Sequence, residues 1–235
     1  MKIAIMQPYF LPYIGYFQLM AAVDRFVLLD DVNFINRGWI NRNRIALNGE
    51  SHWLTIPLIG ASQNKLINDI EILPDVSWKK KMLRTVQMNY ASSPHFEAVF
   101  QLLCKILYAA HGNLSSFLSL SLIMIKKYLG LTTDIELSSG IYPKLDLKGE
   151  PRILDICIKE AASTYVNPYS GKFLYKEANF AASGVDLLFL DSKISKLRLE
   201  HSGKEGPILS ILDLMMLNSP SAIAHALTDF DLTRS

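Results

Sequence analysis

Two adjacent carboxylates, Asp30 and Asp31, have the residue type and the position in the chain to carry chemistry. They follow the apolar run 26–29, which has the pattern of a buried strand. At the carboxyl end of a strand, a carboxylate can bind Mg²⁺, accept a hydrogen bond from a sugar hydroxyl or act as a general base. Because consecutive strand residues point to opposite faces, we expect one of the two to face a ligand. A helix cap or a turn is the alternative role for both.

A cluster of basic and aromatic residues follows these carboxylates. The planar donors of arginine match phosphate or carboxylate oxygens, so the cluster predicts a phosphate-bearing ligand, and a solvated hairpin surface is the alternative. In a strand, the arginines at 42 and 44 would share one face, and the asparagines at 41 and 43 the other. The tryptophan could stack on a base or sugar ring, or simply pack. The candidate binding residues here are Arg37, Trp39, Asn41, Arg42, Asn43, Arg44 and Lys65.

The loop after the first apolar run, 3–6, is a further candidate for ligand contact. Gln7 follows that run, where a loop residue would meet a ligand at the sheet edge. Pro8 and Pro12 fix φ and stiffen the loop. Gly15 would let the backbone approach a ligand closely, or let a helix pack closely on the sheet.

The elements that must position these residues alternate between strands and helices. Apolar runs predict strands at 26–29, 67–72, 135–137, 165–166 and 185–190, with helices at 151–162, 174–182, 208–217 and 221–227. This alternation predicts the α/β class with a mostly parallel sheet. Asn48-Gly49 between the alternating segments 42–47 and 52–56 predicts a β-hairpin. We expect one domain over 1–235, with a mostly helical block inserted at 77–130.

Composition and charge exclude several function classes. The chain has 235 residues, 50% of them hydrophobic, and a net charge of +2, so we expect a sizeable core and no DNA partner. Residues 106–125 carry no charge, but His111, Gly112 and Asn113 interrupt them, so we expect two helices and no membrane span. The amino-terminal run lacks a signal-peptide pattern, which favours a cytoplasmic protein. The five histidines show no metal-ligand spacing, so no metal site is predicted.

Four amino-terminal segments together resemble the WbqC-like protein family, and the resemblance extends over most of the chain. It implies a role in bacterial O-antigen or related surface-polysaccharide synthesis, with transfer of glycine or another amino acid onto an amino sugar. The segment 193–204 departs from the family pattern, since Ser195-Lys196-Leu197-Arg198 stands where tyrosine and glutamine are expected. The matching segments are QPYFLPYIGYF at 7–17, LDDVNF at 29–34, WINRNRI at 39–45 and WLTIP at 53–57, followed by Asn89-Tyr90 with Pro94, Leu174-Tyr175 and LSILD at 209–213.

A more distant similarity links the chain to the HIGH-class nucleotidylyltransferases, which implies a Rossmann-like, HUP-type fold. Tyr13-Ile14-Gly15-Tyr16 stands where that class has His-x-Gly-His. Tyr13 and Tyr16 can donate hydrogen bonds but carry no positive charge at neutral pH, so arginines would have to supply the charge for ATP chemistry. The stretch KISK at 193–196 resembles a lysine loop for ATP phosphates.

These observations support three functional hypotheses. The first is an aminoacyl- or acyltransferase acting on a nucleotide-linked amino sugar with an activated amino-acid or acyl donor. In it the arginines hold phosphates, and Asp30 or Asp31 orients the sugar or takes the proton from its amine. The second is a nucleotidyl- or adenylyltransferase with ATP and Mg²⁺ as cofactors. The third is a noncatalytic ligand-binding protein of the same pathway. The sequence leaves the donor, the sugar and the oligomeric state open.

Overall fold

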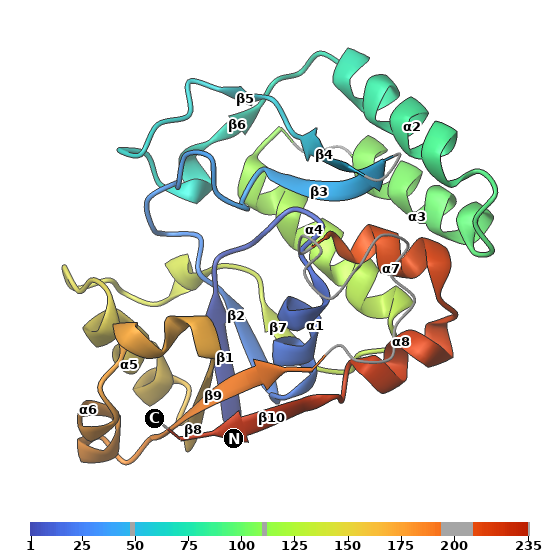
Figure 1. Cartoon of the computed structure of the whole chain (residues 1–235). Coiled ribbons are helices and arrows are strands. Elements are labelled where there is room, and N and C mark those ends of the chain that lie inside the picture. The colour runs from blue at the N-terminus through green and yellow to red at the C-terminus, as the bar shows by residue number, and fades with distance from the viewer. Residues whose placement is uncertain (48–49, 110–111, 194–208, 235) are drawn as a thin grey trace.

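A mostly parallel sheet forms the centre of the molecule (Figure 1). The computed structural model describes residues 1–47, 50–109, 112–193 and 209–234. In this part of the chain the sheet has six strands in the order β10-β9-β8-β1-β2-β7. Neighbouring strands are parallel except β10, which is antiparallel to β9. The bounds are β1 Lys2–Met6, β2 Arg25–Leu28, β7 Asp134–Glu136, β8 Thr164–Pro168, β9 Asp186–Ser192 and β10 Phe230–Thr233. The predicted α/β class is confirmed; the edge strand β10 was not predicted.

Both faces of the sheet are covered by helices, which explains why its strands are apolar on both sides. Ala4, Phe26 and Leu28 belong to one core cluster, while Ile5 and Val27 belong to the other. The first cluster includes residues of α1 (Ile14–Ala21), α7 (Ile211–Leu217) and α8 (Pro220–Ala226). The second includes residues of α5 (Glu150–Lys159) and α6 (Glu177–Ala182).

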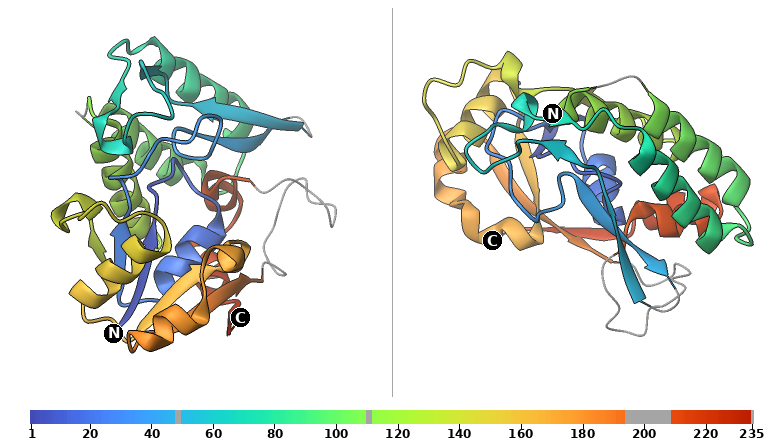
Figure 2. Two further views of the ribbon diagram at one scale, coloured as in Figure 1. Left: turned by 90° about the vertical axis from the view of Figure 1, so that its left-hand side faces the viewer. Right: turned by 90° about the horizontal axis from the view of Figure 1, so that it is seen from above.

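Three further helices occupy the stretch predicted to be a helical block. They are α2 Ser77–Tyr90, α3 Phe96–Tyr108 and α4 Leu114–Tyr128. Buried residues of all three join the core cluster that contains α1. Seen from above, α2 and α3 lie at one end of the molecule, and α5 and α6 at the other (Figure 2). Within the described residues, no helix is long and apolar enough to cross a membrane.

A hairpin stands apart from the central sheet, as predicted. β3 (Arg42–Leu47) pairs antiparallel with β4 (Glu50–Thr55), and residues 48–49 of its turn lie outside the described part. A second short pair joins β5 (Leu58–Ile59) to β6 (Glu71–Ile72). The predicted strand at 67–72 is wrong in its first half, where Ile67–Asp69 forms the 3₁₀ turn η1. The helix predicted at 174–182 begins later, at Glu177.

The order of the strands creates a switch point between β1 and β8. From β1 the chain passes through α1 to β2 on one side, whereas α5 returns it from β7 to β8 on the other side of β1. In open α/β sheets, ligands bind outside the carboxyl ends of the strands at such a point. Gln7, which follows β1, and Tyr169, which follows β8, therefore flank the expected crevice.

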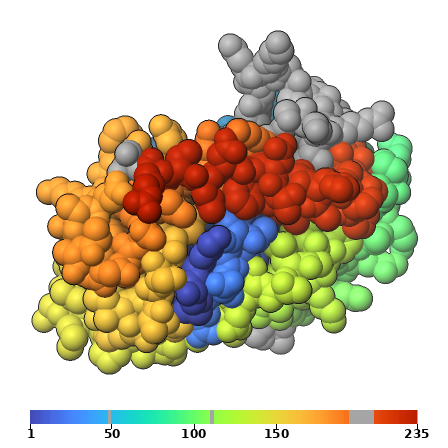
Figure 3. All heavy atoms as spheres, turned by 90° about the horizontal axis from the view of Figure 1, so that it is seen from below, coloured from blue at the N-terminus to red at the C-terminus, as the bar shows by residue number. Residues whose placement is uncertain are grey.

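The carboxyl-terminal strand β10 forms the edge of the sheet opposite to β7. Gln18 of α1 is fully buried, and its side-chain amide donates to the carbonyls of Ala226, at 2.7 Å, and Asp229, at 3.0 Å. Viewed from below, the carboxyl-terminal segment in red runs across the surface beside the start of β1 in dark blue (Figure 3). These contacts tie β10 and α8 to the first helix of the chain.

Candidate functional site

Three adjoining cavities form a groove at the switch point. Their volumes are about 310, 360 and 340 Å³, the size range of small-molecule sites. The first and second share Gln7 and Tyr175 as lining residues, and the second and third share Tyr9 and Ser170. We call the first cavity the basic end, the second the middle and the third the aromatic end of the groove.

Three cationic side chains lie at the basic end. Lys144, Lys148 and Arg152 line this cavity together with Gln7 and Asn33. Arg152 lies in the first turn of α5, and the N-cap of that helix is Gly149, which has no side chain to cap the free N–H groups. The amino-terminal end of a helix carries partial positive charge, which adds to that of the three side chains. The basic end therefore has the electrostatics of an anion site.

Arg152 is buried, with only 2% of its surface exposed, and several hydrogen bonds hold its side chain in place. One of its terminal nitrogens, Nη2, donates to the Asp31 carboxylate at 2.8 Å and to the carbonyls of Ser139 and Tyr142 at 3.0 and 2.9 Å. Its Nε–H has no hydrogen-bond partner among the described residues. Lys144 donates to the backbone carbonyl of Asp31 at 2.5 Å. Asp31 thus positions two of the three cations at this end of the groove.

Asp30 and Asp31 lie just beyond the end of β2, and their side chains contact different helices. Both are buried, at 2% and 6% exposed. Asp31 pairs with Arg152 of α5, on one side of β2. Asp30 instead accepts from the hydroxyls of Ser115 in α4, at 2.6 Å, and Ser138, at 2.7 Å, on the other side. The two carboxylates therefore contact different helices, and Ser139 links them, since its backbone N–H donates to Asp30 and its hydroxyl to Asp31.

The middle of the groove is shaped by tyrosines. The hydroxyl of Tyr16 donates to the Gln7 carbonyl at 3.0 Å, so this buried residue fixes the start of the loop. Tyr9 lines the groove, and its hydroxyl lies 3.5 Å from Oε1 of Gln7. Burial raises the pKa of Tyr9 and of Tyr16 above the ordinary tyrosine value. Both hydroxyls are therefore neutral donors at physiological pH.

The aromatic end is lined by Tyr13, Trp39 and Asn43, among others. Asn43 is buried in β3, and its side-chain amide donates to the carbonyls of Leu11, at 2.7 Å, and Phe10, at 3.2 Å. Leu11 adopts a positive φ of 44°, an unfavourable conformation for a residue with a branched side chain. The Ser210 hydroxyl donates to the same Leu11 carbonyl at 2.9 Å. Two distant segments thus hold the loop in its shape.

Gly15 explains how the Tyr13 ring reaches the groove. A Cβ atom at position 15 would lie 2.3 Å from Cε2 of Tyr13, so a larger residue must displace this ring. Because a tyrosine ring can rotate away, we expect Gly15→Ala to change the free energy of unfolding by less than about 1.5 kcal/mol. The substitution should alter the near-ultraviolet circular dichroism and weaken ligand binding at the aromatic end.

Gly130→Ala is a control for the loss of a glycine. Gly130 lies at a positive φ, no atom lies near a new Cβ there, and the residue is far along the chain from the groove loop. Equal binding by the Gly15→Ala variant and the native protein would contradict this role of Tyr13.

The arginines predicted to bind phosphate lie on the hairpin beside the groove. The guanidinium of Arg42 lies 4.1 Å from the ring centroid of Trp53, and that of Arg44 lies 5.2 Å from Trp39. The two tryptophan rings are 5.6 Å apart. Arg42 and Arg44 thus support Trp39, and they lie outside the linings of the three cavities.

The other predicted binding residues are dispersed. Asn41 donates to the Ile56 carbonyl at 2.9 Å, a contact within the hairpin region. Arg37 is exposed at a positive φ of 59°, and Lys65 is exposed in the loop before η1. Both lie outside the linings of the groove. Of the residues predicted to bind ligand, the structure brings Gln7, Tyr13, Trp39 and Asn43 together along one groove. Of the KISK stretch, only Lys193 lies within the described residues.

Lys144, Lys148 and Arg152 were not among the binding residues predicted from the sequence. The stretch KLDLKGEPR at 144–152 places all three immediately before and within the first turn of a helix, and Pro151 marks that start. A pattern of cations at a helix amino terminus is a usable signal for an anion site. However, only the path of the chain from β7 to β8 brings this segment beside Gln7.

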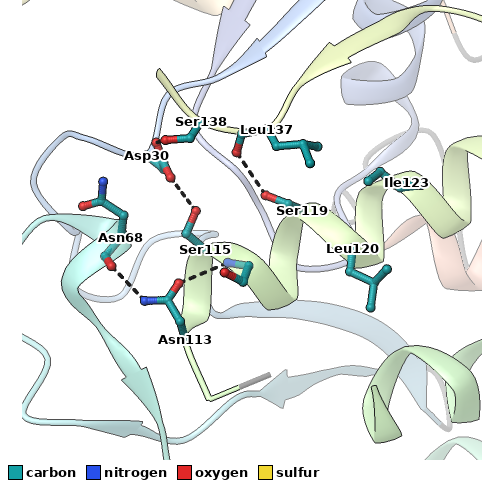
Figure 4. A pocket seen from close by; sticks show the side chains of 10 residues that line it. Asp30, Asn68, Asn113, Ser115, Ser119, Leu120, Ile123, Leu137 and Ser138 are labelled. Atoms are coloured by element: carbon teal, nitrogen blue, oxygen red, sulfur yellow. Dashed lines mark hydrogen bonds between the residues drawn. The ribbon is translucent and has the colours of Figure 1, made fainter. Parts of the chain in front are cut away.

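A fourth cavity, of about 600 Å³, lies beside Asp30 (Figure 4). Its polar lining comes from four places: the segment after β2, η1, the N-cap and first turns of α4, and the segment after β7. Leu120, Ile123 and Leu137 form its apolar wall. The polar lining residues are Asp30, Asn68, Asn113, Ser115, Ser116, Ser119 and Ser138. We call it the serine-lined cavity.

Fold and groove together define an α/β protein whose candidate site lies at the switch point of a mostly parallel sheet. The chain belongs to the WbqC-like protein family, whose model matches residues 7–225. It is 32% identical over 216 residues to the uncharacterized protein Rv1507c of Mycobacterium tuberculosis, covering 91% of this chain and 92% of that protein. No solved structure matches the chain significantly. The resemblance seen in the amino-terminal segments is thereby confirmed.

Proposed function

We propose that this protein binds a nucleotide-linked amino sugar in the groove and transfers an acyl or aminoacyl group, such as glycine, to the sugar amine. The pathway we propose is the synthesis of O-antigen or a related surface polysaccharide. The observation that carries the proposal is the division of one groove into a basic end and an aromatic end. A nucleotide-linked sugar has the matching division, since it carries a diphosphate between two rings.

The basic end supports the placement of the diphosphate. Lys144, Lys148 and Arg152 provide three cations, and Asp31 neutralises only one of these charges directly. Among the described residues that line the three cavities there is no carboxylate to repel a phosphate. Charge-assisted hydrogen bonds to phosphate are about twice as strong as neutral ones. This end is therefore where we place the two phosphate groups.

The aromatic end supports the placement of a ring. Tyr13 and Trp39 line this cavity, and Trp39 is 37% exposed, so its ring is accessible. A tryptophan face can stack on a base or on the apolar face of a sugar. Arg44, near the Trp39 ring, and Asn43, bonded to the loop, hold this wall in place.

The transfer itself requires that an amine nitrogen attack an activated carbonyl carbon. The new C–N bond forms, the leaving group departs with the electron pair of its bond to carbon, and the nitrogen gives its proton to that group or to water. The contribution of the groove is to fix the amine against the donor, because orientation alone removes a large part of such a barrier. In this proposal Asp31 acts on the groove by orienting Arg152. Asp30 faces the serine-lined cavity, so its proposed contact is with a group bound there.

The structure gives less support to adenylyl transfer. Of the two tyrosines that replace the histidines of the HIGH class, Tyr16 is buried and donates to the Gln7 carbonyl. Only Tyr13 lines the groove, and burial raises its pKa, so it stays neutral. Neither tyrosine supplies the positive charge that stabilises the transferring phosphate.

A thermal-shift experiment tests the proposed function. We expect a nucleotide-linked amino sugar, at about 100 times its Kd, to raise Tm by roughly 5–10 °C. Its counterpart without the amine should give a smaller rise, and mass spectrometry should detect acylated product once an activated donor is added. A rise with ATP alone would favour the adenylyltransferase, and binding without turnover for any donor would favour a noncatalytic protein. No shift with any nucleotide sugar would contradict the proposal.

A further inference from the structure

The serine-lined cavity contains a buried carboxylate that has no cationic partner among the described residues. The Asp30 carboxylate lines it and is only 2% exposed. The groups that donate to this carboxylate are the hydroxyls of Ser115 and Ser138 and the backbone N–H of Ser139, whereas the Ser139 hydroxyl donates to Asp31. All of these donors are neutral, and no cation forms an ion pair with Asp30 among the described residues. Burying a carboxylate without a cation is costly, so the site favours a ligand that brings positive charge.

The rest of the lining offers acceptors as well as donors, since Ser116 and Asn68 carry a hydroxyl and an amide. Oδ1 of Asn68 has no hydrogen-bond partner among the described residues, but it is fully buried and is not open to the cavity. The side-chain N–H₂ group of Asn113 is already used, since it donates to the Asn68 carbonyl at 2.8 Å. Ser119 donates its hydroxyl hydrogen to the Leu137 carbonyl at 3.3 Å, which leaves its lone pairs free to accept. Figure 4 shows these oxygens on elements that surround the cavity.

An ammonium group matches this lining in both charge and hydrogen bonding. It carries one positive charge and three N–H donors, and it accepts no hydrogen bond. A volume of about 600 Å³ is far more than a bare metal ion needs, and Leu120 and Ile123 offer an apolar wall for a carbon skeleton. We propose that the serine-lined cavity binds a small aliphatic molecule through its primary ammonium group, with Asp30 as the counter-ion.

This inference goes beyond the proposed function, because the cavity lies on the other side of β2 from Arg152 and requires no nucleotide in its ligand. Two sources share the chemistry: an amino acid, on the donor side of a transfer, and an amino sugar, on the acceptor side. Glycinamide represents the first and glucosamine the second. Acetamide and glucose are the matched neutral probes, since each keeps a similar size without the charge.

Isothermal titration calorimetry with these four probes tests the inference. We expect one or both ammonium probes to bind, and their neutral counterparts to bind roughly tenfold to a hundredfold more weakly. Binding by glycinamide alone assigns the cavity to the amino acid, and binding by glucosamine alone assigns it to the sugar. Equal binding of charged and neutral probes, or no binding of either ammonium probe, would overturn the proposal.

Two variants locate the binding. Asp30→Asn removes the charge at nearly constant shape, and Leu120→Phe fills the cavity from the half-buried surface of α4 without touching Asp30. Each should reduce ammonium binding at least about tenfold. Leu120→Phe keeps the test decisive if Asp30→Asn does not fold. Nucleotide-sugar binding in the groove should be unchanged in Leu120→Phe, which separates failure of this inference from failure of the proposed function. Full ammonium binding by both variants would contradict the assignment.

Discussion

Replacing Asp31 by alanine is expected to lower the free energy of unfolding by about 3–5 kcal/mol. The reason is the buried pair at the basic end of the groove. Asp31 and Arg152 meet at 2.8 Å, and their side chains are 9% and 2% exposed. Without Asp31, the buried Arg152 guanidinium would keep only its longer contact to the Asp155 carboxylate, at 3.4 Å. Urea unfolding followed by circular dichroism measures the change.

Two further variants show whether burial is the cause. Asp134→Ala removes a carboxylate that also pairs with an arginine, Arg25, but its side chain is 69% exposed. We expect this control to cost less than about 1 kcal/mol. The double variant Asp31→Leu/Arg152→Met should recover much of the lost stability, because no buried charge is left unpaired. If Asp31→Ala cost no more than Asp134→Ala, the buried pair would not have the role we give it.

The double variant Lys144→Gln/Lys148→Gln is expected to weaken nucleotide-sugar binding by about a hundredfold while the protein stays folded. Both side chains line the basic end, and each lost charge removes one charge-assisted contact to phosphate. The binding of the native protein should also decline with added salt more steeply than that of the variant, because exposed charges are screened. Isothermal titration calorimetry at two salt concentrations measures both effects.

Lys65→Gln is the matched control for this experiment. Lys65 is an exposed lysine that was predicted from the sequence, with the arginines, to bind phosphate. It lies outside the groove lining. We expect it to bind nucleotide sugar within about twofold of the native protein. A loss as large as that of the double variant would instead place the phosphates beside the loop that contains Lys65.

The amino-terminal half of the site was predictable because its signals are local. An apolar run followed by two carboxylates predicted that Asp30 and Asp31 lie at the end of a strand, and they follow β2 within three residues. The Asn-Gly pair likewise predicted the hairpin that carries Asn43 and Trp53, and the Trp39 ring packs against Trp53. Each of these inferences depends on fewer than about ten neighbouring residues, the range over which periodicity and turn chemistry act.

The basic end was not predictable because its components are distant in sequence. Arg152 reaches Asp31 across 121 residues, and a single sequence does not state which strands become neighbours. The order of the sheet decides this, since β8 returns beside β1 while β7 stays at the edge next to β2. The strand β10 was missed because it is short: FDLT alternates apolar and polar residues, but four exposed or half-exposed residues give a weak signal.

The loop that lines the groove has a consequence for how the protein acquires function during synthesis. The Leu11 carbonyl accepts hydrogen bonds from Asn43 and from Ser210, which lies 199 residues further along the chain. Contacts of such long sequence separation form late in folding, because long chain segments must first be ordered. On the ribosome, the amino-terminal strand and its loop emerge early but lack the partner that holds Leu11 in place. A growing chain therefore gains the complete groove only after nearly the whole sequence has been translated.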